Sequence, residues 1–296
     1  MSNWLRSWAL VVGAQGTGIS FSSLSGNDLR IVFEVTKTAL STPNKAKISL
    51  YNLSPTTENK IATVFTSVML LAGYGGQNTM LFTGNIASIE RKYEPPDLVS
   101  TFTAGDGDHD YQNAVVNTTV AAGTDHKAEI AASLGSMAAT VAGAVVVAAQ
   151  GTRLRGKVLS GPARDVLSNM ARNLDAHWSI QDGKLVVCDA KSAIPTPTIP
   201  LVSATTGMIG FPEVTEKGLK IKMQLMPQLA IGGLFQLQTS FAQIKAPKQG
   251  KKSARGASNL GSARTDPNGT YKVNTIKHSG DSRGDAWSTE VECVRI

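Results

Sequence analysis

The sequence predicts a mainly β protein of the α+β class, in which two β regions flank a small α/β domain. Near both ends of the chain, short segments alternate between apolar and polar residues and are separated by Gly-rich turns. The middle of the chain changes to apolar residues at helical spacing. Glycine is frequent, with 28 residues, while aromatic residues make up only 6%, and this composition suits turn-rich β structure.

A chain of 296 residues can hold two or three domains and bury a sizeable core. We expect a first β domain over residues 1–120, an α/β domain over 121–190 and a second β domain over 191–296. Repeated Pro in residues 194–200 predicts an extended linker at the last boundary.

The first β domain opens with predicted strands at residues 8–12 and 29–35. The stretch 45–91 organises the rest of this domain. Residues 46–53 alternate as a half-buried strand does, and Ser54-Pro55 then stops that strand and starts a helix, with Ser54 as the N-cap. Glu58 falls in the first helical turn, where the helix dipole favours a carboxylate. The expected apolar face of this helix is Ile61, Ala62 and Phe65. Further strands are expected at residues 68–73, 80–91 and 98–103, with a glycine turn at 73–78.

Two loops of this domain resemble ligand-binding loops, but the spacing of their residues does not match those motifs. Asp106, Asp108 and Asp110 alternate as in a calcium loop, but Gly and Glu are missing from the later positions that such a loop needs. The sequence therefore predicts an acidic turn between strands. Residues 13–18 imitate a dinucleotide-binding loop, but strand-like sequence comes after them instead of a helix. We expect no cofactor and no metal.

In the α/β domain, Thr124 can cap a helix that runs to about Ala139, and a strand is expected at 144–148. Ser160-Gly161-Pro162 opens a second helix. Residues 177–180 and 185–188 form a hairpin around Asp182-Gly183, a strong tight-turn signal. The apolar face of the second helix is Val166, Leu167, Met170 and Leu174.

The second β domain contains predicted strands at 218–226, 234–238, 271–278 and 287–296, with a turn at 280–284. In the first of these, the inward residues are Leu219, Ile221, Met223 and Leu225.

Cys188 and Cys293 are the only cysteines, and both fall in predicted strands, so we expect buried free thiols. Residues 131–150 carry no charge but consist mostly of small residues, which makes a poor membrane segment. No membrane anchor is expected.

A basic loop is predicted over residues 245–270. Gly, Ser and Ala fill it, and its basic residues nearly account for the net charge of +7. Such a segment cannot bury enough apolar area to fold alone. It is either a solvated flexible loop or an arm that becomes ordered on an acidic partner. Its candidate partner-binding residues are Lys245, Lys248, Lys251, Lys252, Arg255 and Arg264.

Five segments resemble, in order and spacing, the hub proteins of phage tails and baseplates, which are similar to the hub part of type VI secretion spike proteins. Because none of them carries a chemical motif, the resemblance rests on their order along nearly the whole chain. The segments are ISLYNLSPTTENKI, LFTGNIASIER, GDGDHDYQNAVVN, RGKVLSGPARDVLSNMARNLDAHWSIQDGKLVV and HSGDSRGDAWSTEVECVRI.

The resemblance implies two small tail-tube-like β-barrels flanking the α/β domain. It implies a homotrimeric ring that joins the sixfold tail tube to the threefold spike and forms part of the channel for DNA ejection. The implied partners are the tail tube protein and the spike or puncturing protein, with the tape-measure and baseplate wedge proteins as further candidates and DNA only in transit. The implied location is the tail baseplate of the virion, after assembly in the host cytoplasm.

An enzyme would need a nucleophile with its base, paired carboxylates or metal ligands, and no such constellation has suitable spacing. We therefore expect a structural protein and no enzyme. The alternative is a basic structural protein that binds nucleic acid, although the basic loop lacks interleaved aromatic residues. The salt dependence of DNA binding separates the two classes.

Overall fold

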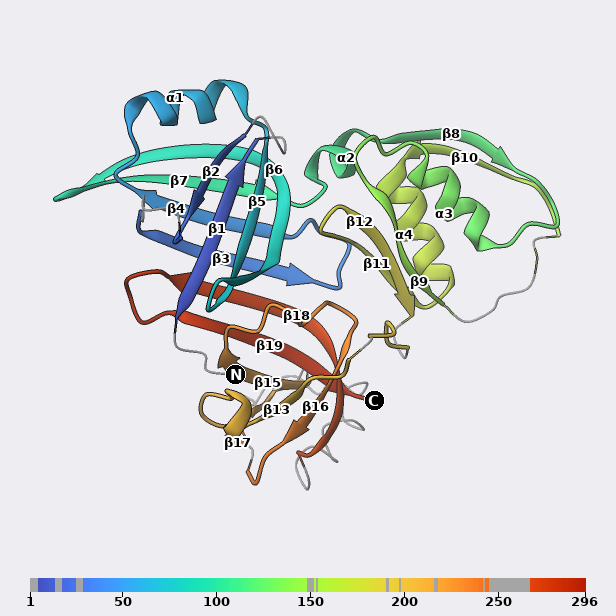
Figure 1. Cartoon of the computed structure of the whole chain (residues 1–296). Helices are drawn as coiled ribbons and strands as arrows, with labels where there is room; N and C mark the ends of the chain where they lie inside the picture. The colour runs from blue at the N-terminus through green and yellow to red at the C-terminus, as the bar shows by residue number, and fades with distance from the viewer. Residues whose placement is uncertain are drawn as a thin grey trace, which may run out of the picture.

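A computed structural model describes residues 5–13, 18–24, 29–147, 152, 154–189, 192–196, 198–215, 218–241, 243–244 and 267–296. Strands dominate, so the mainly β prediction is confirmed. In Figure 1 the first β region lies at the upper left, the helices of the middle unit at the upper right and the C-terminal strands below.

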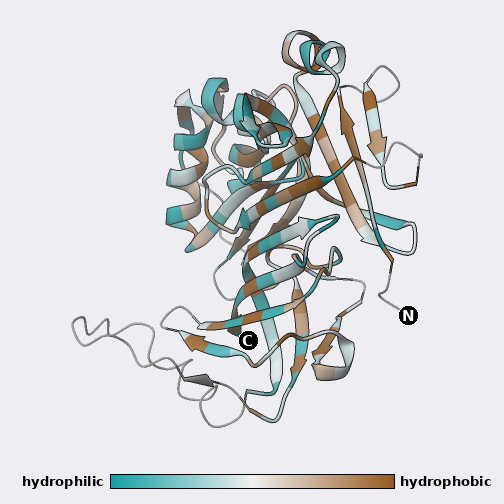
Figure 2. Ribbon diagram, turned by 90° about the vertical axis from the view of Figure 1, so that its left-hand side faces the viewer, coloured by the Kyte–Doolittle hydropathy of each residue, from teal (hydrophilic) through white to brown (hydrophobic). Residues whose placement is uncertain are grey.

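In its described residues, the first β region comprises seven strands and one helix: β1 (Arg6–Val12), β2 (Ile19–Ser22), β3 (Ile31–Thr38), β4 (Lys45–Tyr51), α1 (Pro55–Val64), β5 (Ser67–Tyr74), β6 (Gln77–Glu94) and β7 (Asp97–Gly105). The predicted alternation is present along these strands: Ile31, Phe33 and Val35 are buried, with more exposed residues between them. Figure 2 shows the same alternation as bands of hydrophobic and hydrophilic colour.

Helix α1 begins as predicted, because the Ser54 hydroxyl oxygen accepts a hydrogen bond from the Thr57 N–H at 3.2 Å. Its buried face differs from the prediction. Ile61 is buried but Ala62 is exposed. The buried position one turn earlier is Glu58, which accepts a hydrogen bond from Ser100 at 3.0 Å and pairs with Arg91 at 3.1 Å. The sequence predicted that the Glu58 carboxylate interacts favourably with the helix dipole. The structure shows that the same carboxylate also binds the helix to the sheet.

The middle unit, as far as the structure describes it, holds three helices and five strands: α2 (Asp108–Asn113), β8 (Val115–Val120), α3 (His126–Leu134), β9 (Val141–Val146), β10 (Lys157–Pro162), α4 (Ala163–Asn173), β11 (Ala176–Gln181) and β12 (Lys184–Asp189). β8 pairs with β10, and β11, β12 and β9 form a three-stranded sheet. In Figure 1, α3 and α4 lie between these two sheets.

Several boundaries in this unit were predicted wrongly. The first helix expected in this domain is α3. It is capped by Asp125, whose carboxylate accepts a hydrogen bond from the Lys127 N–H, and it ends at Leu134 instead of Ala139. Ser160-Gly161-Pro162 belongs to β10, so the second helix starts only at Ala163. The acidic turn predicted near Asp108 contains the short helix α2, and the strand expected at 144–148 lies at β9. The hairpin of β11 and β12 is confirmed.

The C-terminal β region comprises β13 (Leu201–Ser203), the short 3₁₀ helix η1 (Ala204–Thr206), β14 (Glu213–Thr215), β15 (Gly218–Gln224), β16 (Leu234–Gln238), β17 (Gln243–Ile244), β18 (Gly269–Asp281) and β19 (Trp287–Arg295). The inward residues predicted for β15, Leu219, Ile221 and Met223, are all buried, as is Leu225 beyond its end.

One 14-stranded sheet links the first and the C-terminal β regions. Its main path runs β17-β14-β15-β19-β18-β3-β4-β7-β6-β5-β1-β2, with β13 and β16 beside it. The long strand β18 makes the link, because residues from Thr275 to Asp281 pair with β3 while its beginning pairs with β16. The described strands show no closed barrel, so the two predicted barrels are not confirmed.

The described residues pack into three hydrophobic cores. The first belongs mainly to strands β1–β7 but includes Leu225 and Trp287 from the C-terminal β region. The second lies around α3 and α4, and the third lies among β15, β16, β18 and β19. Leu225 and Trp287, together with the pairing of β3 with β18, join these two β regions. No described helix is long and apolar enough to cross a membrane.

Candidate functional site

The predicted basic site cannot be placed. Its residues Lys245, Lys248, Lys251, Lys252, Arg255 and Arg264 all lie outside the described residues, as do residues 14–17 of the loop that imitates a dinucleotide site. The structure instead gathers polar groups where the middle unit meets the two β regions. We call this meeting place the junction.

Two aspartates of the acidic loop act as acceptors for distant backbone. Asp110 accepts hydrogen bonds from the N–H groups of Ala138, Ala139 and Thr140 at 2.7–3.2 Å and from the Thr140 hydroxyl at 2.8 Å. These bonds lower the pKa of Asp110 although burial opposes them. Asp110, which was predicted to lie in an acidic turn, therefore holds the segment after α3 through these hydrogen bonds.

Asp106 joins the first β region to the β11–β12 hairpin. Its carboxylate accepts hydrogen bonds from the N–H groups of Asp182, at 2.5 Å, and Gly183, at 2.9 Å, and from the side-chain amide of Asn44 at 3.3 Å. Its side chain is fully buried. Burial raises the pKa of Asp106 to about 6, and the hydrogen bonds from Gly183, Asp182 and Asn44 act against that rise.

Further polar contacts surround Asp106. The Lys37 ammonium lies 2.6 Å from the Asp182 carboxylate, and the amide of Gln181 donates to the carbonyl of Thr38 at 2.8 Å. The Asn44 amide also donates to the carbonyl of Ile180 at 2.8 Å. The middle unit is thus attached at the hairpin tip by hydrogen bonds and one ion pair.

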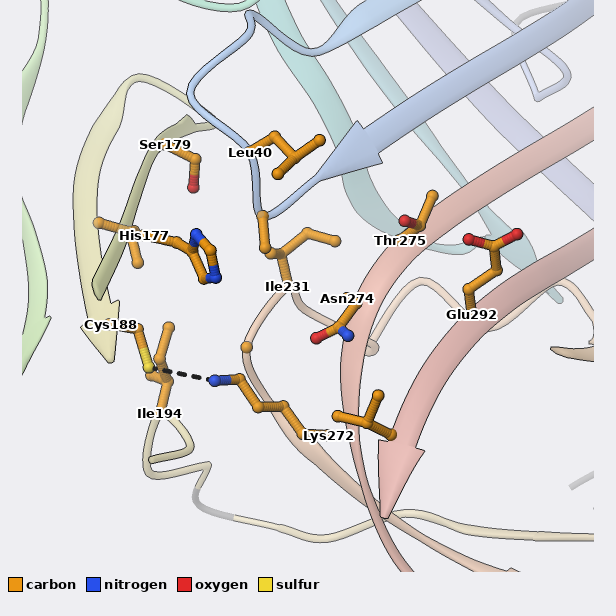
Figure 3. A pocket seen from close by; sticks show the side chains of 14 residues that line it. Leu40, His177, Ser179, Cys188, Ile194, Ile231, Lys272, Asn274, Thr275 and Glu292 are labelled. Atoms are coloured by element: carbon orange, nitrogen blue, oxygen red, sulfur yellow. Dashed lines mark hydrogen bonds between the residues drawn. The ribbon is translucent and has the colours of Figure 1, made fainter. Parts of the chain in front are cut away.

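Beside these contacts lies a cavity of about 500 Å³, which we call the junction cavity. Figure 3 shows its walls: His177 and Ser179 from β11 on one side, Asn274 and Thr275 from β18 on the other, with Leu40 and Ile231 between them. The remaining lining residues are Ala39, Val186, Cys188, Ile194, Gly232, Lys272, Glu292 and Val294.

Lys272 closes one end of the junction cavity. Its ammonium donates to the carbonyls of Asp189, at 2.9 Å, and Ser192, at 2.5 Å, and lies 3.7 Å from the Cys188 sulfur (Figure 3). A buried lysine is thus satisfied by backbone oxygens, and it fastens the chain that leaves β12 to the C-terminal β region.

The cysteines behave as predicted. Cys188 and Cys293 are both buried and unbridged. Burial raises the pKa of the Cys188 thiol, with nearby Lys272 opposing, and burial also raises the pKa of Cys293. Cys188 lies opposite His177 in the hairpin register, but its thiol donates to the Ser192 carbonyl at 3.2 Å. A protonated thiol used in this way is a poor nucleophile.

Among the described residues, no three His, Cys, Asp or Glu side chains form a group that could hold a metal ion. The junction cavity mixes apolar walls with a few polar groups. The arrangement is suited to holding the middle unit and the β regions together.

Comparison with solved structures finds tail proteins. The chain is similar to the prophage MuSo2 43 kDa tail protein from Shewanella oneidensis, with a TM-score of 0.59 and 10% identity over 97% of this chain and 98% of that one. It is also similar to a tail protein from Neisseria meningitidis MC58, with a TM-score of 0.58 and 12% identity over 97% of this chain and 96% of that one. A third similar structure is the E. coli c3393 protein, with a TM-score of 0.54 and 10% identity over 91% of this chain and 74% of that one. That protein is a component of the type VI secretion system and is structurally similar to the T4 tail proteins gp27 and gp5.

At these identities the similarity concerns the fold. No curated protein sequence matches the chain. A family model does: the one described as Baseplate hub gp41 matches residues 12–243, from the end of β1 to the start of β17. This match spans most of the chain and agrees with the tail-protein fold, so the chain belongs to the baseplate hub gp41 family.

Proposed function

We propose that the protein is the structural hub of a phage baseplate, a homotrimeric ring that joins the sixfold tail tube to the threefold spike. The observation that carries this proposal is the baseplate hub family match over residues 12–243. A hub must hold its parts in a fixed arrangement, and the continuous sheet through β3 and β18 supplies such a connection within one subunit.

The symmetry argument follows from two β regions in each subunit. Three subunits would present six β regions around one axis, which matches a sixfold tube on one side and a threefold spike on the other. In this proposal each β region adopts a tail-tube-like barrel in the ring, and the ring encloses part of the channel through which DNA passes.

The proposed partners are the tail tube protein and the spike, then the tape-measure and wedge proteins of the baseplate. The similarity to a type VI secretion component supports a partner on the spike side. The proposed location is the virion tail, and assembly takes place in the host cytoplasm.

We propose a role without catalysis. The strongest candidate group in the junction cavity, Cys188, has a thiol whose pKa is raised by burial and whose proton is donated to a backbone carbonyl. The carboxylates of Asp106 and Asp110 accept hydrogen bonds from the protein itself.

The direct test is the mass of the purified protein by light scattering and native mass spectrometry, alone and with its neighbouring tail proteins. We expect a closed trimer. A monomer that persists in the presence of the tube and spike proteins, or a strictly sixfold ring, would refute the adaptor role.

The basic loop allows a second test. Replacing Lys248, Lys251, Lys252 and Arg255 with Ser should leave trimer formation intact and weaken binding to one partner at low salt, because each exposed pair contributes only about 0–1 kcal/mol and several act together. Wild-type assembly of infectious particles would show that this loop is merely solvated. The nucleic-acid alternative predicts DNA binding that falls steeply with salt and is lost in this variant.

A further inference from the structure

The junction cavity is larger than the gaps that ordinary packing leaves inside a protein. Protein interiors contain few voids larger than a water molecule, whereas this cavity measures about 500 Å³, which is the size of pockets that hold small ligands. One wall comes from β11 and β12 of the middle unit, and the other comes from β18 of the C-terminal β region (Figure 3). A molecule bound here would therefore contact both units at once.

A β-bulge directs a polar side chain into this cavity. In the pairing of β18 with β19, Val273 lies opposite Cys293 and Thr275 lies opposite Glu292, so Asn274 is the extra residue between them. Bulges are frequent beside functional sites, where they change the direction of a side chain. The Asn274 amide points into the cavity in Figure 3, and it has no hydrogen-bond partner within the described part of the chain.

The opposite wall carries a buried hydroxyl group. Ser179 is 3% exposed, and its side-chain oxygen accepts a hydrogen bond from the Gln181 amide at 3.0 Å. Its own proton has no acceptor among the residues that the structure describes. A buried donor without an acceptor costs free energy, and a ligand that supplies the acceptor would recover this cost.

The charges beside the cavity do not favour a charged ligand. Of the described lining residues, only Lys272 and Glu292 are lysine, arginine, aspartate or glutamate, and their charges are opposite. The Lys272 ammonium already donates to the carbonyls of Asp189 and Ser192, and Glu292 lies opposite Lys220 in the register of β15 and β19. A charged ligand would lose its hydration without meeting a free counter-charge, so an uncharged ligand is favoured.

The apolar part of the lining is aliphatic. Leu40 and Ile231 lie between the two walls in Figure 3, and Val186 and Ile194 add to the apolar surface. No described Phe, Tyr or Trp lines the cavity, so a nucleobase would find no such ring to stack on. The lining therefore suits a molecule with an aliphatic body.

We propose that the junction cavity binds a small uncharged amide group next to an aliphatic body. The Asn274 side chain offers a donor and an acceptor side by side, which match the acceptor and donor of an amide, and the Ser179 hydroxyl offers a second donor. The aliphatic body would contact Leu40 and Ile231. This chemistry is shared by free small molecules and by an aliphatic residue in the chain of a partner protein. The site lies within one subunit, so it does not depend on the proposed ring.

The test is isothermal titration of the purified full-length protein at pH 7 with four related compounds. N-acetyl-leucinamide is uncharged and carries amide groups beside an aliphatic side chain. N-acetyl-leucine has a carboxylate instead of the terminal amide, leucinamide has a mostly protonated amino group, and N-acetyl-glycinamide lacks the aliphatic side chain. We expect N-acetyl-leucinamide to bind at least about tenfold more tightly than each of the others, and to raise the unfolding temperature because it binds the folded protein.

Two variants test the walls of the cavity. Asn274→Leu keeps the size of the side chain and removes both hydrogen-bonding groups, so it should bind N-acetyl-leucinamide about tenfold more weakly or worse. Val186→Phe fills part of the cavity from the middle unit and should abolish binding. Asn117→Leu is the matched control, because Asn117 is exposed in β8, and its variant should bind normally. Circular dichroism reports whether each variant folds.

A pentapeptide with a central leucine, acetylated and amidated at its ends, distinguishes the two sources of the ligand. Tighter binding than N-acetyl-leucinamide assigns the cavity to a partner chain, and weaker binding assigns it to a free molecule; both support the amide chemistry. The proposal is overturned by no binding of N-acetyl-leucinamide, by equal or tighter binding of a charged compound, or by unchanged binding in Asn274→Leu. Light scattering on the same samples reports the subunit number independently, so a failure of the ring proposal is recognised separately.

Discussion

Replacing Asp106 with Asn should change the way the stability of the protein depends on pH. Asp106 is fully buried at the junction, where it accepts hydrogen bonds from the N–H groups of Asp182 and Gly183. Burial raises its pKa from 3.8 to about 6. The Asn variant keeps a similar shape but does not titrate, so it removes the proton-linked part of the stability.

The sign of this effect follows from proton binding. Between about pH 4 and pH 6 the folded protein holds a proton on Asp106 that the unfolded chain has already released. Stability from this group is therefore fully present below pH 4 and is lost as the pH rises through 6. A rise of about two in the pKa, at about 1.4 kcal/mol for each unit, gives a loss of about 3 kcal/mol in the unfolding free energy.

His278 acts in the opposite direction over the same range. It is buried, and desolvation lowers its pKa to about 3, with Lys37 adding to the effect. Its Nδ1 lies 2.8 Å from the hydroxyl oxygen of Thr289, which also accepts a hydrogen bond from the Met226 N–H. The unfolded chain protonates this histidine below about pH 6.5, so its contribution to stability rises with pH. The wild-type curve is therefore a balance of opposing contributions, and only the difference from the variant isolates Asp106.

The assay is urea unfolding of both proteins at several pH values between 4 and 7, followed by tryptophan fluorescence. The difference in unfolding free energy between wild type and Asp106→Asn should change by about 3 kcal/mol across this range, in the direction that favours the variant at high pH. Asp110 and Asp281 titrate below this window because hydrogen bonds keep the pKa of each below its usual value. A difference that stays constant with pH would refute the reasoning.

Three other substitutions test the packing of the fold. Ile48→Asp places an unpaired charge in the first core, where Ile48 is fully buried, so it should cost more than about 4 kcal/mol and prevent folding; a normal soluble yield and melting temperature would contradict this. Lys272→Met should cost about 2–3 kcal/mol in urea unfolding, because the carbonyls of Asp189 and Ser192 lose their donor; an unchanged unfolding free energy would disprove the fastening role. Ser54→Ala should cost about 1 kcal/mol in urea unfolding and Ser54→Gly only a few tenths, and equal losses would argue against a capping role.

Local patterns predicted the elements whose cause is local. The strand β15 follows from alternation alone, and the start of α1 follows from the hydroxyl of Ser54 and the ring of Pro55. The end of α3 was missed because Ala and Ser continue the helical composition past Leu134, whereas the N–H groups of Ala138, Ala139 and Thr140 donate to the distant carboxylate of Asp110 instead of continuing the helix. Small residues carry too weak a pattern to separate helix from turn.

Long-range pairing could not be predicted in the same way. β18 pairs with β3, and His278 lies opposite Val35, although more than 200 residues separate them along the chain. Alternation says which face of a strand is buried but does not name its neighbour. The edge-to-face contact of the Phe211 and Phe241 rings has the same origin, since each residue lies two positions before one of the paired residues Glu213 and Gln243 in the short parallel strands β14 and β17.

At the junction, a turn that the sequence predicts makes a long-range attachment that the sequence does not predict. Asp182 and Gly183 have φ angles of 52° and 75°, which a two-residue hairpin turn requires and which the dipeptide Asp-Gly predicts. In such a turn the two central N–H groups are not used by the strand ladder, so they remain available at the tip. Here both donate to Asp106, a residue that the sequence placed only in an acidic loop. The turn was predictable because its geometry is local, and the attachment was not because it depends on where the fold places a carboxylate 76 residues away.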